Sequence, residues 1–140
     1  MTFKNLICAT TIVASLFCQT SFAAQDKMIF KNKRGSVLEF AVLADNKIEG
    51  HFTTAVASPS CPQAVNKKRP IIGYIIGNAV TFSVVYPMCD SLLTVSGNFS
   101  KTKTGIDTLS ILNKQALDIR HEGPGARMIG HDFFKKVDKV

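Results

Sequence analysis

The segment at residues 70–97 constrains the fold more than any other part of the chain, because it contains three consecutive strand patterns. A Gly77-Asn78 pair separates the first two strands, expected at 71–76 and 79–86, and such a pair is typical of tight β-hairpins. The second strand is rich in Val, Phe and Thr, which favour extended structure. Residues 87–90 interrupt the pattern before a third strand begins at Ser91. The segment therefore predicts consecutive antiparallel strands.

Shorter strand patterns, separated by turns, fill the rest of the chain between residues 26 and 136. We expect further strands at 26–30, 36–43, 47–56, 105–113 and 127–136, and the third central strand runs on toward residue 100. Eight short strands with regular turns predict a closed all-β domain. Antiparallel neighbours in sequence order predict an eight-stranded up-and-down β-barrel, which has no free edges and has room for one small ligand.

An outer-membrane barrel is the alternative with similar strand patterns. Its strands need about 9–11 residues and an apolar outer band, whereas most strands here are shorter and carry Thr and Ser on both faces. Alternation along a strand also assigns side chains to faces. His51 alternates with Phe52, and His131 alternates with Asp132, so both histidines are expected to face outward.

The first 23 residues have the pattern of a secretory signal peptide. Lys4 precedes an uncharged apolar run at 6–18, and Ser21-Phe22-Ala23 supplies small residues next to a cleavage point. The run is shorter than the roughly 20 residues of a membrane span, which disfavours the alternative of a membrane anchor. We therefore expect cleavage after Ala23, a β-barrel domain at 24–140, and a secreted or periplasmic location without membrane attachment.

Removal of the first 23 residues leaves two cysteines, Cys61 and Cys89, in the mature chain. Two cysteines in an exported domain most often form one disulfide. Neither these cysteines nor the three histidines are spaced like the ligands of a metal ion. The sequence therefore predicts a disulfide between Cys61 and Cys89 and no metal site.

The formal net charge of +7 comes from Lys and Arg residues that are scattered over expected loops and strand ends. Such charges are typical of a solvated surface, and no aromatic residues alternate with them as in a binder of single-stranded nucleic acid. No nucleophile and base are spaced as a catalytic pair. We therefore expect neither nucleic-acid binding nor enzymatic activity, and no cofactor.

Seven short motifs, taken in order, resemble the avidin and streptavidin family. They are Asn32-x-x-Gly35-Ser36, Gly50-His51-Phe52-Thr53-Thr54-Ala55-Val56, Pro70-x-x-Gly73, Phe82-Ser83-Val84, Ser91-x-x-Thr94-x-Ser96-Gly97, Ile106-Asp107-Thr108 and Gly130-His131-Asp132-x-Phe134. The resemblance covers about residues 30–137. It implies an avidin-like β-barrel that binds biotin inside the barrel.

Within the family, the chain is most similar to the short dimeric bacterial avidins of the rhizavidin type. In those proteins a disulfide links the loops that hold Cys61 and Cys89 here. The dimeric members also lack the Trp that tetrameric members contribute to a neighbour's pocket, and Gly123-Pro124-Gly125 stands at that place. The resemblance therefore implies a homodimer.

The resemblance also assigns the polar part of a biotin site. It places Asn32 and Ser36 at the urea oxygen, with Phe52 where the family has a Tyr. It places Thr54 and Asp132 at the urea N–H groups. Ser91 corresponds to a residue at the carboxylate tail, and Leu93 replaces a Thr that contacts the sulfur. Without the ordered motifs, Asn32 would be interpreted as a turn residue and Asp132 as a surface carboxylate.

The apolar part of the site departs from the family because the chain contains no Trp. Tyr86 stands in place of one Trp, Val95 in place of a second large aromatic residue, and Ser110 in place of a third. Buried apolar area contributes about 25 cal/mol per Å², and a missing donor to a buried oxygen costs a further ~1–3 kcal/mol. We therefore expect weakened biotin binding. The alternative is an avidin fold that has lost biotin and recognises another small ligand or a protein partner.

Overall fold

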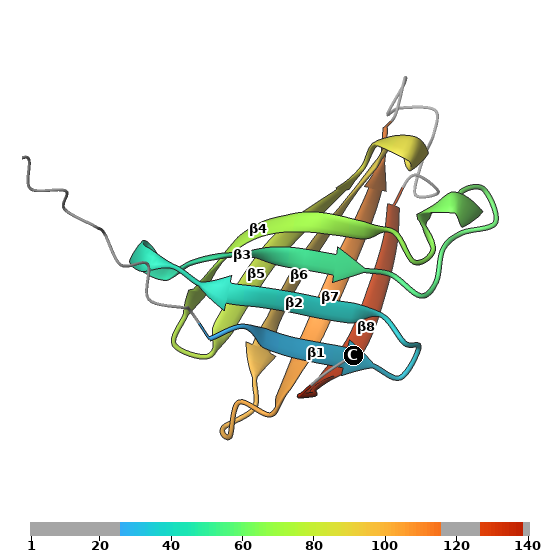
Figure 1. Ribbon diagram of the computed structural model, residues 1–140. Helices are drawn as coiled ribbons and strands as arrows, with labels where there is room; N and C mark the ends of the chain where they lie inside the picture. The colour runs from blue at the N-terminus through green and yellow to red at the C-terminus, as the bar shows by residue number, and fades with distance from the viewer. Residues whose placement is uncertain (1–25, 116–126, 139–140) are drawn as a thin grey trace, which may run out of the picture.

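A closed barrel of antiparallel strands accounts for most of residues 26–115 and 127–138, which are the residues that the computed structural model describes (Figure 1). The strands are β1 (Met28–Asn32), β2 (Val37–Val42), β3 (Lys47–Thr53), β4 (Lys68–Ile76), β5 (Ala79–Tyr86), β6 (Ser91–Phe99), β7 (Gly105–Lys114) and β8 (Arg127–Lys136). Each strand pairs with the next in sequence, and pairing of β1 with β8 closes the barrel. The predicted eight-stranded up-and-down architecture is confirmed.

The expected limits of β5 and β8 are correct, whereas β1, β3 and β4 differ from expectation. β1 continues to Asn32 although its last residues are polar, because the Asn32 side chain points into the barrel and is buried. β3 ends at Thr53 rather than residue 56. β4 begins at Lys68 rather than residue 71. Pro70 indicates a strand boundary because it has no N–H group, yet it pairs with His51 inside the sheet.

Short 3-10 helices and tight turns connect the strands. These helices are η1 (Ala44–Asn46), η2 (Pro62–Ala64) and η3 (Pro87–Cys89). The Gly77-Asn78 turn is confirmed, and Gly77 adopts a φ of 59° that few other residues tolerate. The Cys61–Cys89 disulfide is present and joins the β3–β4 connection to the β5–β6 connection, so both loops lie at the same end of the barrel.

The core of the barrel follows from alternation along the strands. In β5, for example, Val80, Phe82, Val84 and Tyr86 are buried while the residues between them are not. Aromatic rings fill the end of the barrel away from the disulfide. There, Phe30 stacks on Phe40 with ring centroids 5.9 Å apart, and Phe99 contacts both rings. His51 and His131 are exposed on the outer face, as expected.

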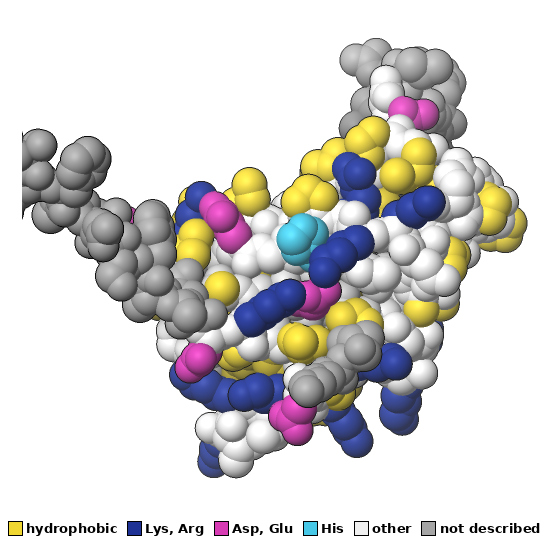
Figure 2. All heavy atoms as spheres, in the orientation of Figure 1, with side chains coloured by type: hydrophobic (Ala, Val, Ile, Leu, Met, Phe, Trp, Pro, Cys, Tyr) yellow, Lys and Arg dark blue, Asp and Glu magenta, His cyan; other side chains and the backbone are white. Residues whose placement is uncertain are grey.

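Most charged side chains of the described residues lie on the outside of the barrel. Figure 2 shows Lys and Arg side chains spread over one face among acidic and apolar groups rather than gathered in one patch. No helix in residues 26–115 or 127–138 is long and apolar enough to cross a membrane. The expected signal peptide at 1–23 and the Gly123-Pro124-Gly125 stretch lie outside the described residues.

Candidate ligand-binding cavity

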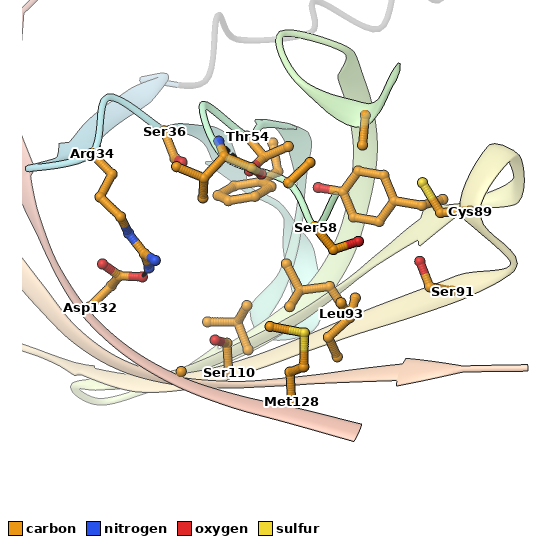
Figure 3. A pocket seen from close by; sticks show the side chains of 18 of the residues that line it. Arg34, Ser36, Thr54, Ser58, Cys89, Ser91, Leu93, Ser110, Met128 and Asp132 are labelled. Atoms are coloured by element: carbon orange, nitrogen blue, oxygen red, sulfur yellow. Dashed lines mark hydrogen bonds and ion pairs between the residues drawn. The ribbon is translucent and has the colours of Figure 1, made fainter. Parts of the chain in front are cut away.

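A cavity of about 560 Å³ opens into the barrel at the end that carries the disulfide-linked loops. Its walls come from most strands of the barrel, and Figure 3 shows labelled side chains from several of these strands pointing into it. All ten residues assigned to a ligand site from the sequence line this cavity: Asn32, Ser36, Phe52, Thr54, Tyr86, Ser91, Leu93, Val95, Ser110 and Asp132. The fold therefore brings these positions together around one space.

Asn32 and Ser36 present hydrogen-bond donors to the cavity. Both side chains are buried. The Asn32 Oδ1 atom accepts a 2.8 Å hydrogen bond from the Ser36 backbone N–H, and the Ser36 Oγ atom accepts a 3.0 Å bond from the Ala55 N–H. These bonds occupy an acceptor of each side chain. The Asn32 Nδ2 group and the Ser36 hydroxyl proton are therefore the groups that can donate to a ligand.

Thr54 offers the cavity a hydrogen-bond acceptor, whereas Asn32 and Ser36 offer donors. Its hydroxyl donates a 2.6 Å hydrogen bond to the Val56 carbonyl and accepts a 3.3 Å bond from the Val56 N–H. Because the only hydroxyl proton is committed to the loop, Thr54 can interact with a ligand only through a remaining lone pair. The local loop geometry thus makes Thr54 an acceptor for a ligand N–H group.

A backbone hydrogen bond and a side-chain ion pair position Asp132. Its backbone carbonyl accepts a 2.8 Å hydrogen bond from the Thr108 hydroxyl. Its carboxylate forms an ion pair with Arg34, and the two side chains point toward each other across one side of the cavity in Figure 3. The ion pair uses Oδ2 of Asp132. The other carboxylate oxygen remains an acceptor for a ligand N–H group.

Arg34 was not identified as a site residue from the sequence. It lies in the β1–β2 turn between Asn32 and Ser36, both of which were assigned to the site. That position was an available signal, because a turn that supplies two cavity residues also brings the residue between them to the rim. The partner could not be inferred from it, since Asp132 lies 98 residues away along the chain.

Phe52 is packed in an aromatic cluster beneath the polar residues. Its ring centroid lies 6.2 Å from that of Phe82 and 6.3 Å from that of Phe134, and its side chain is buried. A phenylalanine supplies no hydroxyl for a ligand. The cluster therefore forms an apolar part of the cavity lining, to which Phe52 and Phe134 belong.

Tyr86 contributes a polar atom to a largely apolar part of the cavity wall. Its side chain is 4% exposed. Its hydroxyl is the one buried side-chain polar atom without a hydrogen-bond partner among the described residues. Burial raises the pKa of Tyr86 to about 12, against an opposing influence of the Arg69 charge. The hydroxyl is therefore protonated at neutral pH and free to donate.

The rim of the cavity holds Ser91 and Lys114, which pair across β6 and β7. Lys114 was missed from the sequence because it stands at the boundary between a strand and a polar segment. Its Nζ atom donates a 2.7 Å hydrogen bond to the Ser60 hydroxyl in the β3–β4 connection. Lys114 therefore places a cation at the rim and ties β7 to a loop over the cavity.

Deeper in the wall, Val95 pairs with Ser110, and Ser110 faces Gly130 on β8. A Cβ atom at Gly130 would lie 2.7 Å from the Ser110 Oγ, so glycine keeps this part of the cavity open. Further lining residues that the sequence did not indicate are Thr108, Leu112, Met128 and Phe134. Within the described part of the chain, no group of three His, Cys, Asp or Glu side chains is placed to hold a metal ion.

Solved structures share this fold at low sequence identity. A complex of a shwanavidin variant with biotin aligns with a TM-score of 0.66 and 22% identity over 82% of this chain and 98% of that one. Core-bradavidin aligns with a TM-score of 0.67 and 23% identity over 80% and 100% of the two chains. A rhizavidin–biotin complex aligns with a TM-score of 0.63 and 21% identity over 82% and 94%.

Sequence comparison gives the family directly. A search of curated protein sequences returned no significant match. The sequence profile described as the Avidin family matches residues 24–137, which is most of the chain and includes every strand of the barrel. The chain therefore belongs to the avidin family.

Proposed function

We propose that this protein binds biotin, or a small cyclic urea or amide with the same polar edge, in the cavity of the barrel. The observation that carries the proposal is the division of polar roles at one side of the cavity. Asn32 and Ser36 have donors left to offer, whereas Thr54 and Asp132 have acceptors left to offer. A cyclic urea has one carbonyl oxygen between two N–H groups, which is the complementary pattern.

The proposed binding is non-catalytic and weaker than is usual for the family. Phe52 gives no hydrogen bond to the urea oxygen, and Val95 and Ser110 leave space where large aromatic residues would otherwise cover the ligand. Each 1.4 kcal/mol corresponds to about tenfold in affinity. Since large aromatic residues each bury about 150–250 Å², the losses together amount to several orders of magnitude in affinity.

A second proposal, that the cavity has lost biotin and binds another small ligand or a protein partner, draws support from one observation. The Arg34–Asp132 ion pair already satisfies part of the carboxylate on which the urea N–H group would depend. A ligand N–H must share Asp132 with a guanidinium. This competition favours a ligand with acceptor groups at that position over a neutral urea.

We further propose that the protein is exported after removal of residues 1–23 and forms a homodimer. The outer face of β6, β7 and β8 supports the dimer, because it exposes apolar side chains at Leu92, Leu109, Ile111, Ile129 and Phe133. Ile111 and Ile129 are directly paired on this face. Contiguous exposed apolar patches on an antiparallel sheet are typical of contact surfaces. Sedimentation of wild type and Ile111→Lys tests this, and a wild-type monomer would contradict it.

The polar pattern can be tested with a substitution that removes one donor without disturbing the loop. Asn32→Asp keeps the Oδ1 acceptor for the Ser36 N–H and removes the Nδ2 donor. We expect it to weaken biotin binding by about tenfold or more, since the urea oxygen would face a carboxylate. Titration calorimetry with biotin measures the change.

Matched controls separate the cavity from the barrel surface. Ser36→Ala removes a buried hydroxyl, whereas Ser83→Ala removes one on the exposed face of β5. Only the first should reduce biotin affinity. Equal biotin affinity in wild type, Asn32→Asp and Ser36→Ala would overturn the proposed function.

A further inference from the structure

We infer that the Tyr86 hydroxyl donates a hydrogen bond to the bound ligand, so that the preferred ligand carries an oxygen acceptor on the side away from its urea-like edge. This inference rests on the proposed function, because it takes the polar edge described above as the place where the urea binds. It adds a specificity-determining contact from the opposite wall of the barrel.

The Tyr86 hydroxyl is buried without a hydrogen-bond partner. Tyr86 is 4% exposed, and among residues 26–115 and 127–138 its Oη atom alone combines burial with the absence of any hydrogen-bond partner. Buried hydroxyls are normally hydrogen-bonded because desolvation without a partner is costly. Since Tyr86 lines the cavity, a ligand atom can supply the missing acceptor.

The Tyr86 hydroxyl keeps its proton and can donate it to a ligand acceptor. Burial raises the pKa of Tyr86 to about 12, so the phenol keeps its proton at neutral pH. Arg69, the charged residue that acts on it, donates a 2.8 Å hydrogen bond from Nε to the Val85 carbonyl. Because a guanidinium has donors and no acceptor, Arg69 does not accept the phenol proton, which remains available.

Tyr86 lies on the other side of the barrel from the polar edge. In the closed strand order, β5 lies opposite β1, while the polar edge comes from residues in or directly next to β1, β2, β3 and β8. Tyr86 pairs with Ser91, and Figure 3 shows Ser91 and Cys89 across the cavity from Arg34 and Asp132. Leu93 and Val95 make the neighbouring wall apolar. We therefore place the Tyr86 hydroxyl on the side of the cavity opposite the polar edge, where it is a separate hydrogen-bonding group for a bound ring.

An unpartnered donor opposite the polar edge specifies the chemistry of the ligand on that side. The bicyclic ring of biotin carries its urea on one side and a thioether sulfur on the other, and a thioether is a weak acceptor. A sulfoxide places an oxygen acceptor at the same position. We therefore expect the cavity to prefer biotin sulfoxide, in one of its two epimers, over biotin.

The state of the hydroxyl in the free protein is tested by Tyr86→Phe, which removes a single oxygen atom. An unpartnered buried hydroxyl predicts a Tm equal to or higher than that of wild type, because the desolvation penalty disappears. Tyr74→Phe is the matched control, since Tyr74 is 58% exposed on the outer face. A lower Tm for Tyr86→Phe, with Tyr74→Phe unchanged, would show that the hydroxyl has a partner and would overturn the inference.

The ligand contact is tested by titrating biotin and each epimer of biotin sulfoxide into wild type and Tyr86→Phe. We expect one epimer to bind wild type about tenfold more tightly than biotin, as one added hydrogen bond allows. Tyr86→Phe should lose that preference, so that the sulfoxide epimer and biotin bind the variant with similar affinity. Biotin binding with no preference for either epimer would overturn the inference and leave the proposed function intact. Failure of all three compounds to bind would overturn both.

Discussion

The two ends of the barrel are built from the same strands and differ in what their inward-facing residues do. At the closed end, Phe30, Phe40 and Phe99 are almost completely buried and contact one another. At the open end, the inward-facing residues surround a cavity and include several polar side chains. On β1 the change occurs within two residues, from Phe30 to Asn32, both of which are buried.

This difference indicates that the residues that stabilise the fold and the residues of the proposed binding site are separated along the barrel axis. Close packing of aromatic rings at the closed end stabilises the folded barrel. The open end can then keep a cavity, an ion pair and an unpartnered hydroxyl where we propose that a ligand binds. Substitutions at the closed end should therefore change the free energy of unfolding, and substitutions at the open end should mainly change ligand affinity.

The largest effect is expected from Phe40→Ala at the closed end. Phe40 is completely buried between Phe30 and Phe99. Truncation of such a ring leaves a cavity and costs about 3–5 kcal/mol in the free energy of unfolding. Urea denaturation measures the loss. Tyr74→Ala is the matched control, and it should cost much less because Tyr74, which lies outside the proposed dimer surface, is already 58% exposed. Equal losses of unfolding free energy in the two variants would contradict the claim that packing at the closed end stabilises the fold.

The disulfide is expected to have the next largest effect, at the open end. Cys61 and Cys89 are 28 residues apart, and closing a loop of this size contributes about 2–4 kcal/mol. Replacing both with Ser should lower the unfolding free energy by this amount and also weaken biotin binding, because the tied loops carry Ser58 and Pro59 at the cavity. Reduction of the wild-type disulfide is the control and should reproduce both changes. An unchanged unfolding curve would contradict the expectation.

Removing the charge of Arg34 tests the difference between the two ends of the barrel, because it should change ligand affinity more than the free energy of unfolding. The Arg34 side chain is about half exposed, and exposed ion pairs contribute about 0.2–1 kcal/mol. Arg34→Leu frees the Asp132 carboxylate for a ligand N–H group, so we expect biotin affinity to rise by about three- to tenfold.

Lys33→Leu controls for the loss of a charge in the same turn and should leave the affinity unchanged. Titration calorimetry distinguishes the two variants. Weaker biotin binding in Arg34→Leu would mean that the guanidinium itself contacts the ligand.

The smallest effect is expected on the outer surface, at Glu39. Burial alone would raise the pKa of Glu39, but hydrogen bonds from Lys27 and Lys68 and the charges of both lysines outweigh it and hold the pKa below its usual range. A lowered pKa stabilises the folded state at neutral pH, and this stabilisation is lost as the pH falls through the folded-state pKa.

Glu39→Gln should therefore unfold slightly more easily than wild type at neutral pH, and the two should converge in acid, once the pH falls below the lowered folded-state pKa of Glu39. Thermal unfolding at neutral pH and in acid checks this. A difference that grows toward acid would contradict the assigned direction of the pKa shift.

The sequence predicts the barrel well where local patterns determine structure. The limits of β5 and β8, the Gly77-Asn78 turn and the outward position of His51 all follow from alternation and turn chemistry. The expected start of β4 at residue 71 was wrong because the basic residues 67–69 are typical of a loop, whereas the pairing of Pro70 with His51 is decided by the neighbouring strand.

Most of the cavity was located through the family motifs, but two of its features depend on contacts between distant residues. Arg34 and Asp132 are 98 residues apart and meet because β1 pairs with β8. The unpartnered state of the Tyr86 hydroxyl depends on everything packed around it. The residue types at these positions can be read from the sequence. Which of their polar atoms lack a hydrogen-bond partner is visible only in the folded barrel.

The most direct test of the account is calorimetric titration of biotin into the disulfide-bonded protein beginning at Ala24, together with Asp132→Ala. The account predicts saturable binding of one biotin per chain, much weaker than the tightest non-covalent complexes, and loss of that binding in Asp132→Ala. The absence of both binding heat and a thermal shift at about millimolar biotin, which corresponds to less than roughly 4 kcal/mol of binding free energy, would contradict it. The barrel would then serve another ligand.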